Sequence, residues 1–272
     1  MSRRLLAYLV LAIGCVIALA PFVVTVFASL KTMPEIVREG VFALPESPIW
    51  GNYRQAWTQG QFGRFFYNST VVAIAVVVPS VLLAAMAGYA FARFRFRGSK
   101  ALFAYLLLGM VIPLQALVIP LFYLLQEFGL LDSLWALILP QIALSMSFGT
   151  LLMRQAFLSV PGEIAEASVL DGANSWQILW QIMFPLSRPL IGTLALLFFI
   201  WTWNEFLLPL TVNIDPHYQT LPVGLLFFQQ RWTSNLPVLA AGATIIFLPL
   251  TAVFIGFQKQ LIEGLTQGAL KG

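Results

Sequence analysis

Residues 159–189 read SVPGEIAEASVLDGANSWQILWQIMFPLSRP, and this stretch decides how the chain is organised. It lies between two apolar runs of membrane length, yet it carries the carboxylates Glu163, Glu166 and Asp171. Glu163 and Glu166 fall in the opening turns of a predicted short helix, where carboxylates interact favourably with the helix dipole. Gly172 then predicts an elbow, because glycine tolerates the left-handed backbone that ends many helices.

A second short helix is expected after the elbow. Asn174 is able to cap it, with Gln177 three residues later reaching back to the cap. Helical spacing places one apolar set on a shared face, namely Trp176, Leu179, Ile182 and Met183. Two short helices around a rigid elbow transmit displacement. The residues therefore favour a docking surface for another protein, and a simple connection between two membrane helices is the alternative.

The composition around this stretch is that of a membrane protein. Of 272 residues, 60% are hydrophobic and 10% are charged, against about 25% charged residues in soluble chains. A helix crosses the hydrocarbon with about 20 apolar residues and satisfies its own backbone. We therefore predict an all-α polytopic membrane protein, with residues 1–272 forming one domain. Its six transmembrane helices are expected at about residues 5–30, 65–92, 101–126, 133–153, 189–214 and 232–258.

Lys and Arg are unevenly distributed over the connections, and this bias predicts the orientation. Ten of the 15 lie on the side that holds both termini and residues 159–189. We expect this side to be cytoplasmic, which gives a cytoplasmic loop at 154–188 and a cytoplasmic tail at 259–272. An uncleaved first helix is favoured over a signal peptide, because its apolar run extends through Leu30.

The sequence lacks the residues that several other chemistries need. It holds no phosphate-binding loop of the form G-x-x-x-x-G-K-[ST], so ATP hydrolysis is expected on a separate chain. Cys15 and His217 are the single cysteine and the single histidine. Neither is part of a set of metal ligands, and no metal site is predicted. The basic residues sit at membrane edges, so we expect no nucleic-acid partner.

Part of the aqueous stretch resembles the EAA motif of permease subunits in ABC importers. The resemblance rests on Glu166-Ala167-Ser168, Asp171-Gly172-Ala173, Ile182 and Pro185-Leu186. It implies a coupling helix that seats in a groove of an ATP-hydrolysing subunit. The coupling residues are then Glu163, Glu166, Ala167, Ser168, Asp171, Gly172 and Ala173. The sequence departs from the family motif at Ser168, where alanine is usual. Because serine is similar in size to alanine, we expect docking to be preserved, with a slightly more polar contact.

Further motifs extend the resemblance over nearly the whole chain. Trp203-Asn204-Glu205-Phe206, followed by LLPL, is similar to the fifth-helix signature of the carbohydrate-uptake branch. Residues 264–272, GLTQGALKG, are similar to the tail of the shorter, six-helix permease type of the maltose importer. Asn68-Ser69 and the turn FARFRFRG at 91–98 also fit. The resemblance implies the type I importer fold and a tail that contacts the ATPase subunits through Gly264, Gly268, Lys271 and Gly272.

The resemblance also implies partners and a location. It implies a second permease, two ATPase subunits that bind ATP and Mg, an extracytoplasmic solute-binding protein and surrounding membrane lipid. No cofactor is expected on this chain. The location is a bacterial or archaeal cytoplasmic membrane, and the solute is a sugar or polyol that the motifs do not name. The same architecture importing glycerol-3-phosphate or another small solute is the alternative.

Glu205 is the one carboxylate inside a predicted span, where a charge is costly and often functional. With Trp203 and Asn204 it is placed to line a sugar path, and the alternative is a structural role, in a buried polar network or at an interface near the outer membrane boundary. Gln115, close to a helix break predicted at Pro113, is a further pathway candidate. An ion-coupled secondary transporter is a rival of another class, but it predicts several membrane carboxylates where this sequence has Glu205 alone. A membrane enzyme acting on lipid is a second rival, and it predicts clustered His, Asp or Glu residues near the membrane surface, which the sequence lacks.

Overall fold

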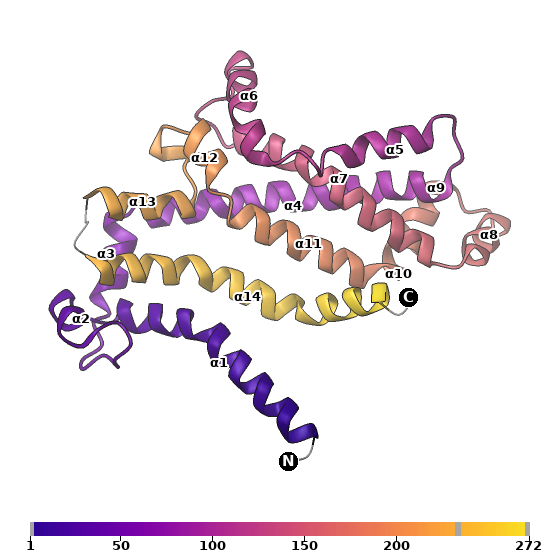
Figure 1. The fold of residues 1–272 in the computed structure, drawn as a ribbon. Helices are drawn as coiled ribbons and strands as arrows, with labels where there is room; N and C mark the ends of the chain where they lie inside the picture. Colours follow the sequence, from indigo (N-terminus) through magenta and orange to yellow (C-terminus); the bar gives the residue numbers. More distant parts are fainter. Residues whose placement is uncertain (1–2, 232–234, 270–272) are drawn as a thin grey trace. The chain divides into compact units, whose positions relative to one another are not determined.

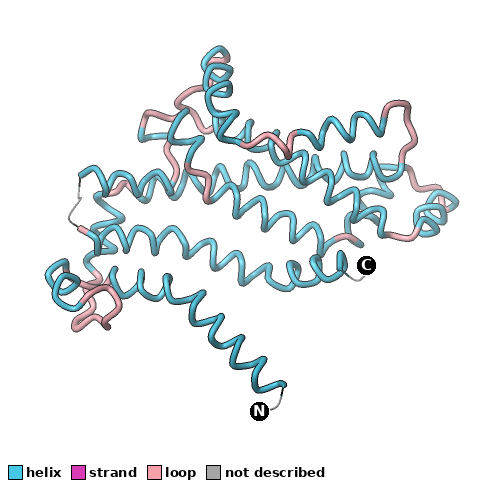
Figure 2. The backbone as a smooth tube through the Cα atoms, in the orientation of Figure 1, coloured by secondary structure: helices cyan, strands magenta, loops and turns pink. Residues whose placement is uncertain are grey.

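The computed structural model describes residues 3–231 and 235–269. Within these ranges the chain is helical and contains no strand (Figure 2), which confirms the all-α prediction. Five of the described segments are long and apolar enough to cross a membrane: Arg4–Ser29, Phe62–Arg93, Trp135–Ser159, Arg188–Val212 and Leu236–Gly264. The third predicted span, residues 101–126, is present instead as two shorter helices.

The chain divides into two compact units, one of Met1–Phe66 with Leu221–Pro249 and one of Tyr67–Thr220 with Leu250–Gly272. The helices wholly within the first unit are α1 (Arg3–Ser29), α2 (Met33–Glu39), α3 (Gly51–Gln59) and α13 (Leu221–Arg231) (Figure 1). Two long helices, α4 (Phe62–Arg93) and α14 (Leu236–Ala269), contribute residues to both units.

Aromatic side chains form the core of the first unit. Phe62 and Phe65 are almost fully buried, and the ring of Phe62 lies 5.4 Å from that of Phe228. The connection after α1 is folded back on itself, because the buried Lys31 ammonium donates to the Gly40 carbonyl at 2.9 Å. Helix α13 falls in a segment that the sequence assigns to a loop. Its apolar run is too short to cross a membrane, and it forms by packing on these phenylalanines.

Small residues let α4 and α7 (Trp135–Ser159) approach closely in the second unit. A Cβ added at Gly88 would lie 2.7 Å from the Cβ of Met153. One added at Gly149 would lie 2.8 Å from the Cβ of Ala84. Neither site has room for a side chain, and close backbone approach of this kind is a main source of helix association in membranes.

A break divides the third predicted span into α5 (Ser99–Leu108) and α6 (Leu114–Glu127). Pro113 precedes α6 with φ −70° and ψ 142°, as expected of a residue that lacks the amide hydrogen and cannot continue a helix. At the other end of the break, Gly109 approaches α7, where the Ser147 hydroxyl donates to the Leu106 carbonyl at 2.7 Å. The break near Pro113 is therefore confirmed, and it is wide enough to end one helix and begin another.

The fifth span is also interrupted. It consists of α11 (Arg188–Trp203) and α12 (Leu207–Val212), and a short 3₁₀ turn follows at Pro216–Tyr218. Helix α14 continues to Ala269, so the predicted tail at 259–272 is helical up to that residue. Helix α7 likewise continues to Ser159, and so includes the first six residues of the predicted cytoplasmic loop at 154–188. Both extensions follow from runs of good helix formers beyond the apolar core, which carry a helix past the membrane edge.

Candidate functional site

The predicted elbow of the aqueous stretch is present. Helix α8 (Gly162–Leu170) follows α7 after a two-residue link, with Glu163 in its first turn. The helix ends at Leu170, and the elbow follows at Gly172, whose φ of +87° is the left-handed conformation that glycine adopts without strain. The Ala173 amide donates to the Ser168 carbonyl at 2.9 Å, which satisfies a carbonyl left free at the helix end.

The second run begins as predicted and then departs from a regular α-helix. Asn174 and Gln177 form a reciprocal capping box, with both hydrogen bonds at 2.9 Å. Beyond α9 (Ser175–Gln177) the chain forms a π-helical segment (Ile178–Met183), then α10 (Phe184–Leu186).

The expected shared face is wrong at one position, because Trp176 is 60% exposed while Leu179 and Met183 are buried. Trp176 instead joins an aromatic row. Its ring centroid lies 5.5 Å from that of Trp180, which lies 5.0 Å from that of Phe184. The wider π-helical turn moves side chains off the positions that regular α-helical spacing predicts.

Arg93, the last residue of α4, fixes the junction between α7 and α8. Its Nη2 donates to the Phe157 carbonyl and to the Val160 carbonyl, both at 2.9 Å. These carbonyls lie at the C-terminal end of α7, where the helix dipole favours a cation. Arg154 adds a second tie, since its guanidinium carbon lies 4.7 Å from the centre of the Phe103 ring. The base of α8 is therefore held to two neighbouring helices.

The outer surface of α8 is acidic and apolar. Glu163, Glu166 and Asp171 are exposed and form no ion pair within the described ranges. Leu170 is 89% exposed and Val169 is 59% exposed, so two neighbouring large apolar side chains lie at the surface of α8. Helix α8 thus presents a surface suited to contact with another protein.

The remaining coupling candidates differ in exposure. Ala167 and Gly172 are exposed, and Ala173 is half-buried against the core. Ser168 is 9% exposed, and its hydroxyl donates to the Ile164 carbonyl at 2.6 Å. The polar contact expected of Ser168 is therefore made within α8. A cavity of about 540 Å³ separates α8 from the end of α4, lined in part by Arg95 and Glu166.

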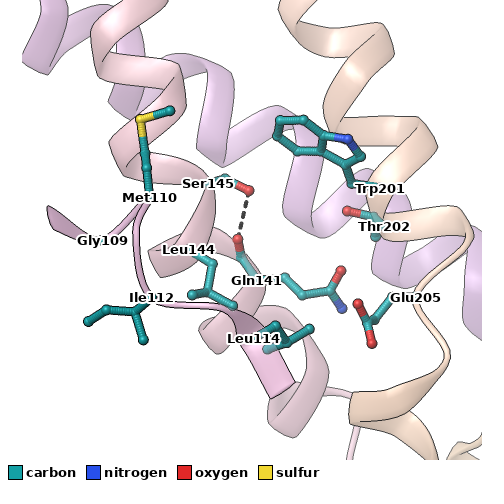
Figure 3. Close-up of a pocket in the computed structure, with 10 residues that line it drawn as sticks. All are labelled: Gly109, Met110, Ile112, Leu114, Gln141, Leu144, Ser145, Trp201, Thr202 and Glu205. Atoms are coloured by element: carbon teal, nitrogen blue, oxygen red, sulfur yellow. Dashed lines mark hydrogen bonds between the residues drawn. The ribbon is translucent and has the colours of Figure 1, made fainter. Parts of the chain in front are cut away.

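A second cavity, of about 440 Å³, lies where the two helix breaks meet α7. Its walls come from the α5–α6 break, from α7 and from the α11–α12 break, and Figure 3 shows their side chains around a common space. The lining residues are Gly109, Met110, Ile112, Leu114, Gln141, Leu144, Ser145, Trp201, Thr202 and Glu205. We call this cavity the pathway pocket.

Of the four pathway candidates named from the sequence, Glu205 lines the pathway pocket. Trp203 is buried and stacks on Phe199, with ring centroids 5.3 Å apart. Asn204 is exposed, and its amide donates to the Ile200 carbonyl at 2.8 Å. Gln115 is exposed on α6 and is not part of the lining. The structure therefore does not bring the four side chains together.

Glu205 has a structural role that the geometry shows directly. It lies in the break between α11 and α12, and its Oε1 accepts a hydrogen bond from the Leu208 amide at 3.0 Å. Such a bond satisfies a backbone donor that the break would otherwise leave free within a membrane span. The Glu205 side chain also belongs to the lining of the pathway pocket (Figure 3).

Sequence reasoning missed Gln141, Ser145, Trp201 and Thr202. Their spacing holds a signal, since Gln141 and Ser145 are four residues apart and Trp201 and Glu205 are four apart as well. Residues at this spacing share one face of a helix. A search for polar or aromatic pairs at this spacing on neighbouring spans would have identified the pocket walls.

The tail candidates are partly described. Gly264 lies inside α14, and an added Cβ there would overlap the Thr193 hydroxyl on α11. That hydroxyl donates to the Gln260 carbonyl at 2.9 Å. Close contact between α14 and α11 therefore requires a glycine at position 264. Gly268 lies in the last turn of α14, while Lys271 and Gly272 lie outside the described residues.

The lone histidine lies away from both cavities. His217 is exposed in the 3₁₀ turn after α12, and its Nδ1 lies 2.9 Å from Asp215 Oδ1. In the described parts of the chain, no group of three or more His, Cys, Asp and Glu side chains is placed to hold a metal ion.

A polytopic helical bundle with an organised helix between two spans is the architecture of an importer permease. Residues 80–267 match the family described as the inner membrane component of binding-protein-dependent transport systems. The chain therefore belongs to this family of ABC importer permeases.

Individual relatives and a solved structure agree with this family assignment. The chain is 31% identical to the diacetylchitobiose uptake system permease protein NgcG of Streptomyces coelicolor, over 98% of this chain and 88% of that protein. It is 32% identical to the sulfoquinovosyl glycerol transport system permease protein SmoH of Agrobacterium fabrum, over 100% of this chain and 95% of that protein. It is also similar to a chain from the crystal structure of a bacterial ABC transporter involved in the import of the acidic polysaccharide alginate. There the TM-score is 0.80 and the identity 25%, covering 95% of this chain and 98% of that one.

Proposed function

We propose that this chain is a permease subunit that carries a sugar or polyol inward across the cytoplasmic membrane. The proposal is supported by the relatives, because proteins named for diacetylchitobiose and sulfoquinovosyl glycerol transport match over nearly the whole chain. Their solutes differ, yet all carry sugar rings, which supports a carbohydrate as the solute class. The pathway pocket, with an indole, an amide and a carboxylate in its lining, fits this class.

Helix α8 is the proposed docking surface for an ATPase subunit. Two observations together support this docking role: α8 is exposed, and its base is firmly held. Leu170 and the three carboxylates face outward, while Arg93 ties the base of α8 to α4 and α7. A surface that is both accessible and rigidly held passes a push to the helices behind it, whereas a flexible loop absorbs the push.

The proposed assembly contains four further chains. They are a second permease, two ATPase subunits and an extracytoplasmic solute-binding protein, with ATP and Mg bound by the ATPase subunits. The distribution of Lys and Arg supports a cytoplasmic position for α8 and for both termini. In this arrangement ATP binding closes the ATPase subunits and moves α8. That movement opens the bundle outward to receive the solute, and ATP hydrolysis returns the bundle to its starting conformation.

The test is solute uptake by the complete importer in membrane vesicles, with the chains encoded beside this one expressed together. The probe is a mixture of three neutral disaccharides: diacetylchitobiose, galactobiose and arabinobiose. We expect ATP-dependent uptake of at least one, and copurification of ATPase chains with this subunit. Leu170→Ser should abolish ATP-driven uptake, while Leu44→Ser, at another exposed leucine (70% exposed), should not. Uptake without ATP, or recovery of this chain with no ATPase, would overturn the proposal.

A further inference from the structure

The pathway pocket contains a buried amide without a protein partner. Gln141 is 8% exposed, and its side chain forms no hydrogen bond with any residue that the structure describes. Figure 3 shows this side chain directed into the pocket, toward the carboxylate of Glu205. The amide nitrogen and oxygen of Gln141 are not among the fully enclosed polar atoms that lack a partner, so the amide opens into the pocket, where water or a solute is able to bond it. An unpaired amide beside a carboxylate is therefore a set of hydrogen-bonding groups prepared for something that enters the pocket.

The opposite wall supplies complementary groups. Thr202 is 9% exposed and contributes a hydroxyl to the lining, and Trp201 is 47% exposed beside it. The rings of Phe148 and Phe198 hold the indole in place, with centroids 5.2 and 5.8 Å from it. A firmly held aromatic ring offers a flat surface to an apolar face of a ligand. The cavity of about 440 Å³ falls within the usual range of small-molecule sites.

We infer that this subunit holds its own binding subsite for one neutral, hydroxylated sugar ring, built on Gln141, Thr202, Glu205 and Trp201. The carboxylate and amide would bind ring hydroxyls, and the indole would stack on the ring's apolar face. The ring is neutral because the lining contains no Lys, Arg or His to pair with an acidic group. The inference rests on the proposed function and adds to it that the solute contacts this chain directly.

The position of the subsite links it to α8. Helix α7 supplies Gln141 and runs without interruption to Ser159, and α8 begins at Gly162 after a link of two residues. The 18 helical steps from Gln141 to Ser159 span about 27 Å at 1.5 Å per residue. The remaining walls are the two helix breaks, which are held by fewer backbone hydrogen bonds than the helices beside them. A displacement of α7 from its α8 end therefore changes the shape of the subsite and releases the sugar.

Cysteine labelling tests occupancy directly. In a Cys15→Ser background, which removes the one native thiol, Met110→Cys places a reporter in the pocket lining. Val111→Cys is the matched control, because it is the next residue, is 77% exposed and does not line the pocket. The whole importer, in vesicles, is treated with a methanethiosulfonate reagent, and the labelling rate of each cysteine is measured with and without the three neutral disaccharides.

We expect the sugars to slow labelling at position 110 at least five-fold and to leave position 111 unchanged. Alginate disaccharide, an acidic counterpart, should give no protection. If the sugars are taken up but position 110 reacts at the same rate with and without them, the subsite is refuted while the proposed function stands. If no sugar is taken up, the proposed function fails and the subsite with it.

Transport kinetics give a second, independent measurement. Gln141→Leu removes the amide at similar volume, and we expect the KM for sugar uptake to rise at least ten-fold. Gln126→Leu, an exposed glutamine on α6 outside the lining, should leave KM unchanged. A Gln141→Leu importer that folds, takes up sugar and keeps the KM of the unmodified importer would overturn the inference.

Discussion

Replacing Arg93 by methionine should uncouple ATP hydrolysis from transport. Arg93→Met keeps the aliphatic stem and removes two charge-assisted hydrogen bonds, to the carbonyls of Phe157 and Val160. Each such bond contributes about 1.5–3 kcal/mol, and because Arg93 is partly exposed, water replaces some of it. We therefore expect the α7–α8 junction to lose about 2–4 kcal/mol of local stability.

Two assays measure this loss of local stability and its effect on coupling. A local destabilisation of about 2 kcal/mol corresponds to roughly 30-fold faster opening, which hydrogen exchange over residues 156–164 would detect. The complete importer should also lose sugar-stimulated ATPase activity and retain its assembly with ATPase subunits. Arg97→Met, at an exposed arginine in the same connection, is the control and should change neither. Unchanged exchange at 156–164 together with normal coupling would refute the role assigned to Arg93.

Substitutions at three further positions have expected outcomes. Gly172→Val places a β-branched residue in the left-handed backbone conformation, so we expect local stability to fall by about 1–2 kcal/mol. The loss should be seen as faster hydrogen exchange at the α8 elbow and weaker copurification of ATPase subunits. Gly149→Leu overfills the contact with Ala84 and should lower the thermal midpoint in detergent, through a cost of about 1–3 kcal/mol. Glu205→Gln keeps an oxygen for the Leu208 amide, so the thermal midpoint should hold while uptake falls; Glu205→Ala should lower both.

Each of the first two substitutions has a glycine control. Gly162→Ala tests α8 at a position without positive φ or close neighbours, and it should leave copurification intact. Gly256→Leu adds the same side chain as Gly149→Leu where no atom lies within 4 Å, and it should leave the thermal midpoint unchanged. Equal effects at test and control glycines would contradict the local explanations. For Glu205, equal thermal midpoints of the Gln and Ala variants would contradict its role at the start of α12.

The sequence predicted those features that depend on local chemistry. The elbow at Gly172, the cap at Asn174 and the break at Pro113 each follow from one or two residues whose backbone preferences are strong. The spans followed from apolar length, and α13 was missed because its helix depends on contacts with Phe62 and Phe65 rather than on its own pattern.

Side-chain direction depends on packing and was predicted poorly. Trp203 and Glu205 are close in sequence, yet Trp203 is the last residue of α11 and Glu205 lies in the break that follows, so one is buried and the other reaches the pocket. Gln141 is a single amide in an apolar span, and its importance becomes visible only when the neighbouring breaks are placed beside it. The inward direction of Ser168 likewise follows from how α8 rests on the helices behind it.

Covalent capture from α8 is the most direct measurement of whether this helix contacts an ATPase subunit and receives its motion. In the Cys15→Ser background, Val169→Cys carries a benzophenone at an exposed apolar position of α8 (59% exposed), and the complete importer is irradiated with and without ATP. We expect a covalent product between this chain and an ATPase subunit, and loss of ATP-driven uptake once it forms. Irradiation that joins the chain to lipid alone, with uptake intact, would contradict the claim that α8 receives the motion of another subunit.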